Sequence, residues 1–154
     1  MKVLIDTNIL LSAPLRSSPL LSAPLRSSPL LSASLNPSGV PYQAYRKAVT
    51  HPNEGCITDQ NVDELRRVYN RKFPHKIPAL ERFLALVLTV VEVVQTPDGR
   101  IADEVLVRDA SDRPILRAAV AAHVDILITG DKDFLESGIT TPHIMTARDF
   151  VQMG

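Results

Sequence analysis

Residues 125–133 read D-I-L-I-T-G-D-K-D, a short apolar run that is typical of a fully buried strand and that ends in a glycine and two aspartates. The N-terminus has the same pattern, since V-L-I at residues 3–5 is followed by Asp6. In a sheet of parallel strands, the residues that follow the strands meet at one edge. If these two strands are neighbours, we expect Asp6 and Asp131 to face one crevice.

The rest of the chain alternates between strand and helix signals. Strands are expected over 55–58, 90–94 and 143–145, and helices over 41–49, 59–72, 78–88, from 112 onward and after 146. Asp59, Asp112 and Thr146 are the expected N-caps of three of these helices. Such alternation predicts an α/β fold with a mostly parallel central sheet of about five strands and helices on both faces.

Composition predicts one soluble domain over residues 1–154, because the chain is 45% apolar and 22% charged. Its longest apolar run, over 84–94, is too short to span a bilayer, and the N-terminus lacks the apolar core of a secretory signal. The single cysteine, Cys56, fits a reducing compartment, so we expect a cytoplasmic protein without a membrane partner. The four histidines show no zinc spacing. A formal net charge of zero argues against a general polyanion binder.

Two further acidic motifs are V-D-E-L, which contains Glu64, and D-A-S-D, which ends at Asp112. Both motifs lie near the start of an expected helix, at the same sheet edge as Asp6 and Asp131. Each acid alone has a local explanation, as a turn former, an N-cap or an exposed helix residue. Four carboxylates at one edge repel one another unless a cation neutralises them, and oxygen ligands suit Mg²⁺ or Mn²⁺. The joint pattern therefore favours a metal site.

The helix expected over 59–72 carries a basic run made of Arg66, Arg67, Arg71 and Lys72. The run has two interpretations, a solvated helix face or a contact surface for RNA phosphates.

A tandem repeat interrupts the N-terminal region. L-L-S-A-P-L-R-S-S-P occupies residues 10–19 and again 20–29, and a third L-L-S-A follows at 30–33. Its prolines prevent a continuous helix or central strand. We interpret residues 10–29 as an insertion, and we expect the first L-L-S-A copy to pack after Ile9.

Four segments in this order resemble the PIN domain: I-D-T-N-I, D-E-L-R-R-V, D-A-S-D-R-P-I-L-R-A-A and I-T-G-D-K-D-F-L. They are most similar to the VapC-like toxin components of prokaryotic toxin–antitoxin systems. The resemblance implies a three-layer α/β/α fold. By position, Asp6, Glu64, Asp112 and Asp131 match the acidic quartet of that family. Asn8 and Thr129 match its polar supporting positions, and Asp109 and Asp133 match additional acids ranked behind the quartet.

The same resemblance implies an endoribonuclease that depends on Mg²⁺ or Mn²⁺, cleaves single-stranded RNA and leaves a 5′-phosphate and a 3′-hydroxyl. It also implies a cognate antitoxin protein and a homodimer. One alternative is a catalytically silent PIN-like module that binds RNA or protein. Another, a phosphotransferase of the haloacid-dehalogenase type, is disfavoured because Asn8 stands where its second aspartate is required. Lys132 is likewise a poor match for the lysine of a receiver-type phosphoacceptor.

Overall fold

The computed structural model describes residues 1–6 and 39–153. The predictions for Asn8, for the insertion at 10–29 and for the packing of its L-L-S-A copies lie outside these residues. The described elements, in chain order, are β1 (Lys2–Ile5), α4 (Val40–Ala48), β2 (Glu54–Thr58), α5 (Asp59–Lys72), η2 (Pro74–Lys76), α6 (Ile77–Val87), β3 (Glu92–Val94), η3 (Ala102–Leu106), η4 (Ala110–Asp112), α7 (Arg113–Ala121), β4 (Ile126–Ile128), α8 (Lys132–Leu135), β5 (His143–Met145) and α9 (Ala147–Gln152).

The five strands form one parallel sheet in the order β3-β2-β1-β4-β5. β1 is central, with Val3 paired to Gly55 of β2 on one side and to Ile126 of β4 on the other. The backbone N–H of Asp6 continues the β1–β4 ladder by donating to the carbonyl of Ile128 at 3.0 Å. The expected α/β fold with a parallel sheet is confirmed, and β1 and β4 are the neighbours that a shared crevice requires.

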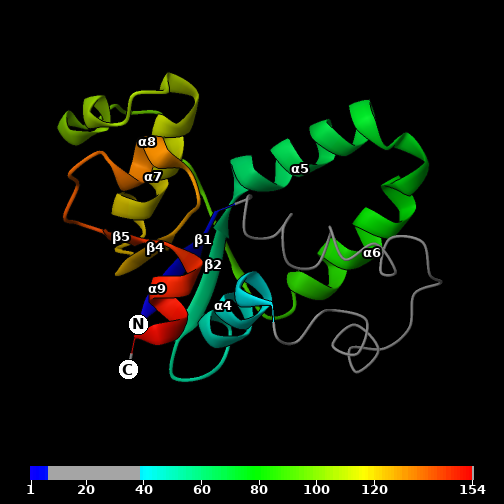
Figure 1. The fold of residues 1–154 in the computed structure, drawn as a ribbon. Coiled ribbons are helices and arrows are strands. Elements are labelled where there is room, and N and C mark those ends of the chain that lie inside the picture. The colour runs from blue at the N-terminus through cyan, green and yellow to red at the C-terminus, as the bar shows by residue number, and fades with distance from the viewer. Residues whose placement is uncertain (7–38, 154) are drawn as a thin grey trace.

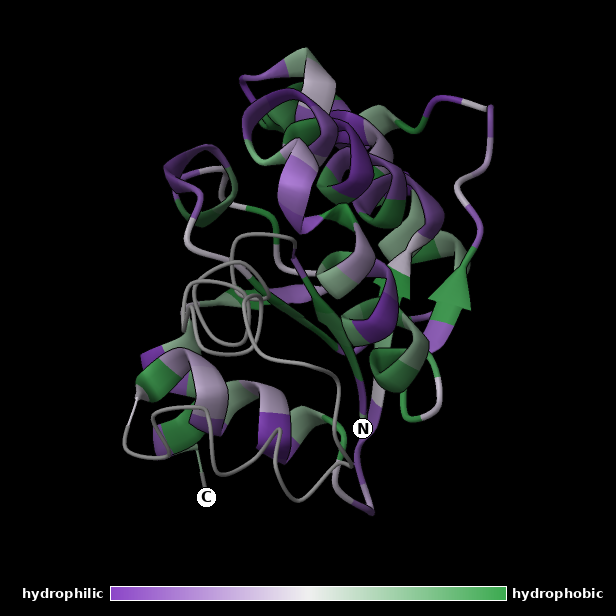
Figure 2. Cartoon of the chain, turned by 90° about the vertical axis from the view of Figure 1, so that its right-hand side faces the viewer, coloured by the Kyte–Doolittle hydropathy of each residue, from purple (hydrophilic) through white to green (hydrophobic). Residues whose placement is uncertain are grey.

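Helices cover both faces of this sheet, because the side chains of a strand alternate between its faces. In β1, Val3 and Ile5 join the core beneath α4, α5, α6 and α9, whereas Leu4 joins the core beneath α7 and α8. Figure 1 shows α5 and α6 as a helical hairpin that reaches away from the sheet. In Figure 2 the strands are mostly hydrophobic, while the helices around them show both hydrophilic and hydrophobic stretches. The result is the expected three-layer α/β/α arrangement.

The helix caps differ in part from those expected. Thr58, not Asp59, is the N-cap of α5, and its hydroxyl accepts from the N–H of Asn61 at 2.9 Å. Asp112 occupies the N-cap position of α7, but its side chain makes no capping hydrogen bond. Thr146 caps α9 as expected, accepting from the N–H of Asp149.

Three short elements near the acidic motifs were not expected from the sequence. They are η3, within the segment 95–108, then η4, within the D-A-S-D motif, and α8, four residues long, whose N-cap is Asp131. All three are too short to show a helical period. Within residues 1–6 and 39–153, no helix is long and apolar enough to cross a bilayer.

Candidate metal centre

Asp6, Thr129 and Asp131 form a hydrogen-bonded group at the carboxyl ends of β1 and β4. Asp6 is only 5% exposed, and its Oδ2 accepts from the buried hydroxyl of Thr129 at 2.7 Å. The same hydroxyl accepts from the backbone N–H of Asp131 at 3.0 Å. Thr129 therefore links the ends of β1 and β4. It lies between Asp6 and Asp131, two members of the quartet that it was expected to support.

Asp112 enters this group from the start of α7. Burial, then a hydrogen bond with Asp131 and the charges of Asp131, Asp109 and Asp6, together raise the pKa of Asp112 to about 8. Like charges and a low-dielectric setting both oppose ionisation of a carboxyl group. Because its side chain does not cap α7, Asp112 is available to bind a cation.

Asp109, Asp112 and Asp133 form a second close group: one carboxylate oxygen from each lies within 4.8 Å of the others. Asp109 accepts from the N–H and the hydroxyl of Ser111 at 3.0 and 2.8 Å, and these bonds lower its pKa. Asp133 follows the N-cap Asp131, whose Oδ1 accepts from the N–H of Asp133 at 2.9 Å. The structure therefore brings the two acids that the sequence ranked second directly beside Asp112.

Glu64 is the one member of the expected quartet that the described contacts do not join to the others. It is exposed on α5, and its carboxylate makes no hydrogen bond or ion pair with another described residue. The helix that carries it begins directly after β2, the neighbour of β1, so Glu64 does lie on an element that starts at the acidic edge. Its role in the site stays a prediction.

The donor chemistry of this edge fits a hard divalent cation. Oxygen atoms of several carboxylates converge there, and Mg²⁺ is typically held by one or two carboxylates together with substrate phosphates. Burial, and after it the neighbouring carboxylates, oppose ionisation of Asp112, as its raised pKa shows. Asp6, Asp112 and Asp131, with Asp109 and Asp133 beside them, are the residues that could hold the ion.

Only one member of the basic run on α5, Arg66, forms an ion pair with another described residue. Arg66 is paired with Glu81 of α6 through two contacts, Nε to Oε1 at 2.7 Å and Nη2 to Oε2 at 3.1 Å. Arg67, Arg71 and Lys72 are exposed, and no hydrogen bond or ion pair joins their side chains to another described residue. A shallow cavity of about 300 Å³ lies between the two helices, lined by Arg66, Arg67, Asn70, Ile77 and Glu81.

Two polar residues beside the centre escaped the sequence analysis. Arg108 pairs with Asp133 and Glu136, and its only signal in the sequence is its place directly before Asp109. Asn61 is 1% exposed; its Nδ2 donates to the carbonyl of Ile5 at 3.4 Å, and its Oδ1 has no partner among the described residues. Both depend on tertiary packing that local patterns do not encode.

The comparison with protein families agrees with this geometry. A family model described as the PIN domain matches residues 2–133. The chain therefore belongs to the PIN domain family, whose members are generally nucleases that use divalent metals. No curated protein and no solved structure gave a match.

Proposed function

We propose that this protein is a metal-dependent endoribonuclease that cleaves single-stranded RNA, and that residues 1–154 form a single PIN domain. The observation that carries the proposal is the convergence of Asp109, Asp112 and Asp133 within 4.8 Å, beside the Asp6–Thr129–Asp131 group. Several carboxylates at the carboxyl edge of a parallel sheet are expensive to keep together without a function that uses a cation.

Mg²⁺ or Mn²⁺ held by Asp6, Asp112 and Asp131 would polarise a phosphodiester and lower the pKa of a bound water molecule. The protein contributes the preorganised cage. Thr129 fixes Asp6 relative to Asp131, and Ser111 keeps Asp109 ionised. Glu64 completes the quartet that we propose, and Asn8 and Asp133 support it.

RNA approaching so acidic an edge needs positive charge nearby, because its backbone is itself anionic. Arg67, Arg71 and Lys72 on α5 are the residues that we propose for this contact, since they are exposed and unpaired among the described residues. Arg66 belongs to the same surface, but its pairing with Glu81 leaves less of its charge for RNA.

The proposal extends to the biological setting of VapC-like toxins. We propose a homodimer and a cognate antitoxin protein. The molecular mass in solution tests the dimer, and binding to the product of an adjacent gene tests the antitoxin.

Purified wild-type protein and an Asp112→Asn variant, incubated with end-labelled single-stranded RNA in Mn²⁺, Mg²⁺ or EDTA, test the activity. We expect the wild type to cleave in either metal and not in EDTA. We expect Asp112→Asn to lose more than about 100-fold in rate, because losing a ligand should exceed the 10- to 100-fold typical of outer-shell partners.

The matched control is Asp149→Asn, which makes the same change at an exposed residue of α9, on the opposite face of the sheet from α7. Cleavage by Asp112→Asn at the wild-type rate would reveal a contaminating nuclease and overturn the proposal. RNA binding by the wild type without cleavage in any metal would favour the catalytically silent module instead.

A further inference from the structure

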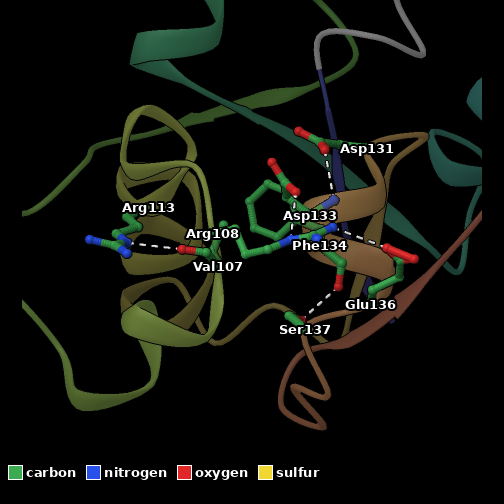
Figure 3. Close-up of polar contacts among 8 residues, drawn as sticks. All are labelled: Val107, Arg108, Arg113, Asp131, Asp133, Phe134, Glu136 and Ser137. Carbon is green, nitrogen blue, oxygen red and sulfur yellow. Dashed lines mark hydrogen bonds and ion pairs between the residues drawn. The ribbon is translucent and has the colours of Figure 1, made fainter.

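Arg108 lies at the edge of the acidic group and contacts two carboxylates, one in α8 and one directly after it. Its Nε lies 3.0 Å from Oδ1 of Asp133, and its Nη2 lies 3.1 Å from Oε2 of Glu136, the C-cap residue of α8. Figure 3 shows the side chain of Arg108 reaching from its own loop toward α8, where its guanidinium group contacts Asp133 and Glu136.

Asp133 is therefore shared between two possible partners. Its carboxylate pairs with Arg108, and it also belongs to the group with Asp109 and Asp112 whose oxygens lie within 4.8 Å of one another. Glu136 is outside that group. A cation that drew on all three aspartates would compete with the guanidinium for Asp133 but not for Glu136.

The backbone beside Arg108 is fixed, whereas its side chain is open to solvent. Val107 is fully buried, and its carbonyl accepts from Nε of Arg113 at 3.0 Å. The side chain of Arg108 is 67% exposed. An arginine held in this way can give up one carboxylate while its loop and its contact with Glu136 stay in place.

We propose that Arg108 is a built-in counter-ion of the metal centre, which occupies Asp133 in the metal-free protein and sets the affinity for the divalent cation by competing with it. This inference rests on the proposed function, because it assumes that the acidic edge binds a metal. Arg108 acts through Asp133 and is a positioning residue.

Two physical effects predict the direction in which metal affinity changes when Arg108 is removed. Metal binding has to break or weaken the ion pair with Asp133, and the guanidinium also repels a doubly charged cation close to it. Removing Arg108 relieves both costs, so metal binding should tighten. An exposed ion pair contributes little to stability, so the change in affinity should be modest. If Arg108 instead served to hold Asp133 in the geometry that binds the ion, its removal would weaken metal binding.

Calorimetric titration of RNA-free protein with Mn²⁺ measures this change in metal affinity without depending on activity. We expect Arg108→Gln to bind Mn²⁺ about two- to fivefold more tightly than the wild type. Arg108→Lys should fall between the two, because it keeps the repelling charge and loses the fork that matches two carboxylates. Arg148→Gln removes the same charge from an exposed position on α9, on the opposite face of the sheet from α8, and should bind like the wild type.

The outcomes separate this inference from the function on which it rests. Unchanged or weaker Mn²⁺ binding by Arg108→Gln, with wild-type binding intact, overturns the counter-ion role and leaves the metal centre standing. If the wild type itself binds no Mn²⁺, the metal centre and the proposed function fail with it. Far-ultraviolet circular dichroism of each variant checks its fold, and Arg108→Lys provides the same comparison if Arg108→Gln does not fold.

Discussion

Glu104 of η3 is a nearly buried carboxylate that accepts three hydrogen bonds. Arg117 of α7 contacts it through Nε at 2.6 Å and Nη2 at 3.1 Å, and the N–H of Ile101 donates at 3.1 Å. The hydrogen bond from Arg117 is the main reason that the pKa of Glu104 falls to about 2. One arginine thus fastens η3 to the helix that carries Asp112.

This pair predicts a stability change on the acidic side. A carboxyl group whose pKa is lowered in the folded protein stabilises it above the ordinary pKa, near 4.5, and this contribution is lost as the pH falls toward 2. We expect Arg117→Met to lower the melting temperature at pH 7, because it leaves the carboxylate of Glu104 without its main partner. The deficit relative to the wild type should shrink between pH 4.5 and pH 2.

Thermal denaturation followed by circular dichroism over this pH range measures the effect. Arg148→Gln serves again as the control for a lost positive charge. A deficit of constant size at every pH would show that Arg117 stabilises the protein through packing alone.

Residues that follow strands were predictable, and residues on irregular segments were not. Asp6 and Asp131 could be placed together because each follows an apolar strand, and the parallel pairing of β1 with β4 brings those ends to one edge. The ranking of Asp109 and Asp133 below the quartet came from family position alone. Their closeness to Asp112 depends on η4 and α8, which are too short to leave a periodic signal.

At the scale of elements, α5 links the acidic edge to the basic surface. It begins directly after β2, buries Leu65 and Tyr69 in the core and turns Arg67, Arg71 and Lys72 outward. The 3.6-residue period of this helix was visible in the sequence, which is why its predicted bounds, 59–72, match the observed ones. Its N-cap was misplaced by one residue because both Thr58 and Asp59 are good capping residues, and Asp59 instead accepts from the N–H and hydroxyl of Thr96.

The outward face of α5 predicts a salt-dependent contact with RNA. We expect replacement of Arg67, Arg71 and Lys72 by glutamine to weaken RNA binding and to reduce the slope of log affinity against log salt by about 2. The estimate follows from three contacts, since each single-strand phosphate contact contributes about 0.7 to that slope. Fluorescence anisotropy with labelled RNA at several salt concentrations, in an Asp112→Asn background to prevent cleavage, gives the measurement.

Arg66→Gln is the informative comparison, because Arg66 is already paired with Glu81 and should change the slope less than any of the three. An unchanged slope in the triple variant would assign the basic run to a solvated helix face.

At the scale of the whole molecule, the order of the strands places the site. The sequence alone predicted the alternation of strands and helices, but the observed order β3-β2-β1-β4-β5 comes from long-range pairing that no local window contains. This order puts β1 at the centre, so that the ends of its two neighbours, β2 and β4, flank Asp6. The acids on three separate segments of the chain are therefore neighbours in space because of topology.

The insertion at residues 10–29 lies outside the described residues, and the sequence makes a direct prediction about it. Deleting it rejoins I-D-T-N-I with the L-L-S-A of residues 30–33, and because residues 10–13 and 30–33 are identical, Ile9 is still followed by L-L-S-A. The closure free energy of a connection depends only weakly on its length, by about 0.6 kcal/mol for each doubling. We therefore expect the deletion variant to melt within a few degrees of the full chain and to retain metal-dependent cleavage of RNA.

Parallel melting curves and cleavage assays compare the two proteins. Activity that appears only in the deletion variant would instead identify the repeat as an inactivating insertion, and unfolding of the deletion variant would show that the second copy replaces a part of the fold that the first cannot supply.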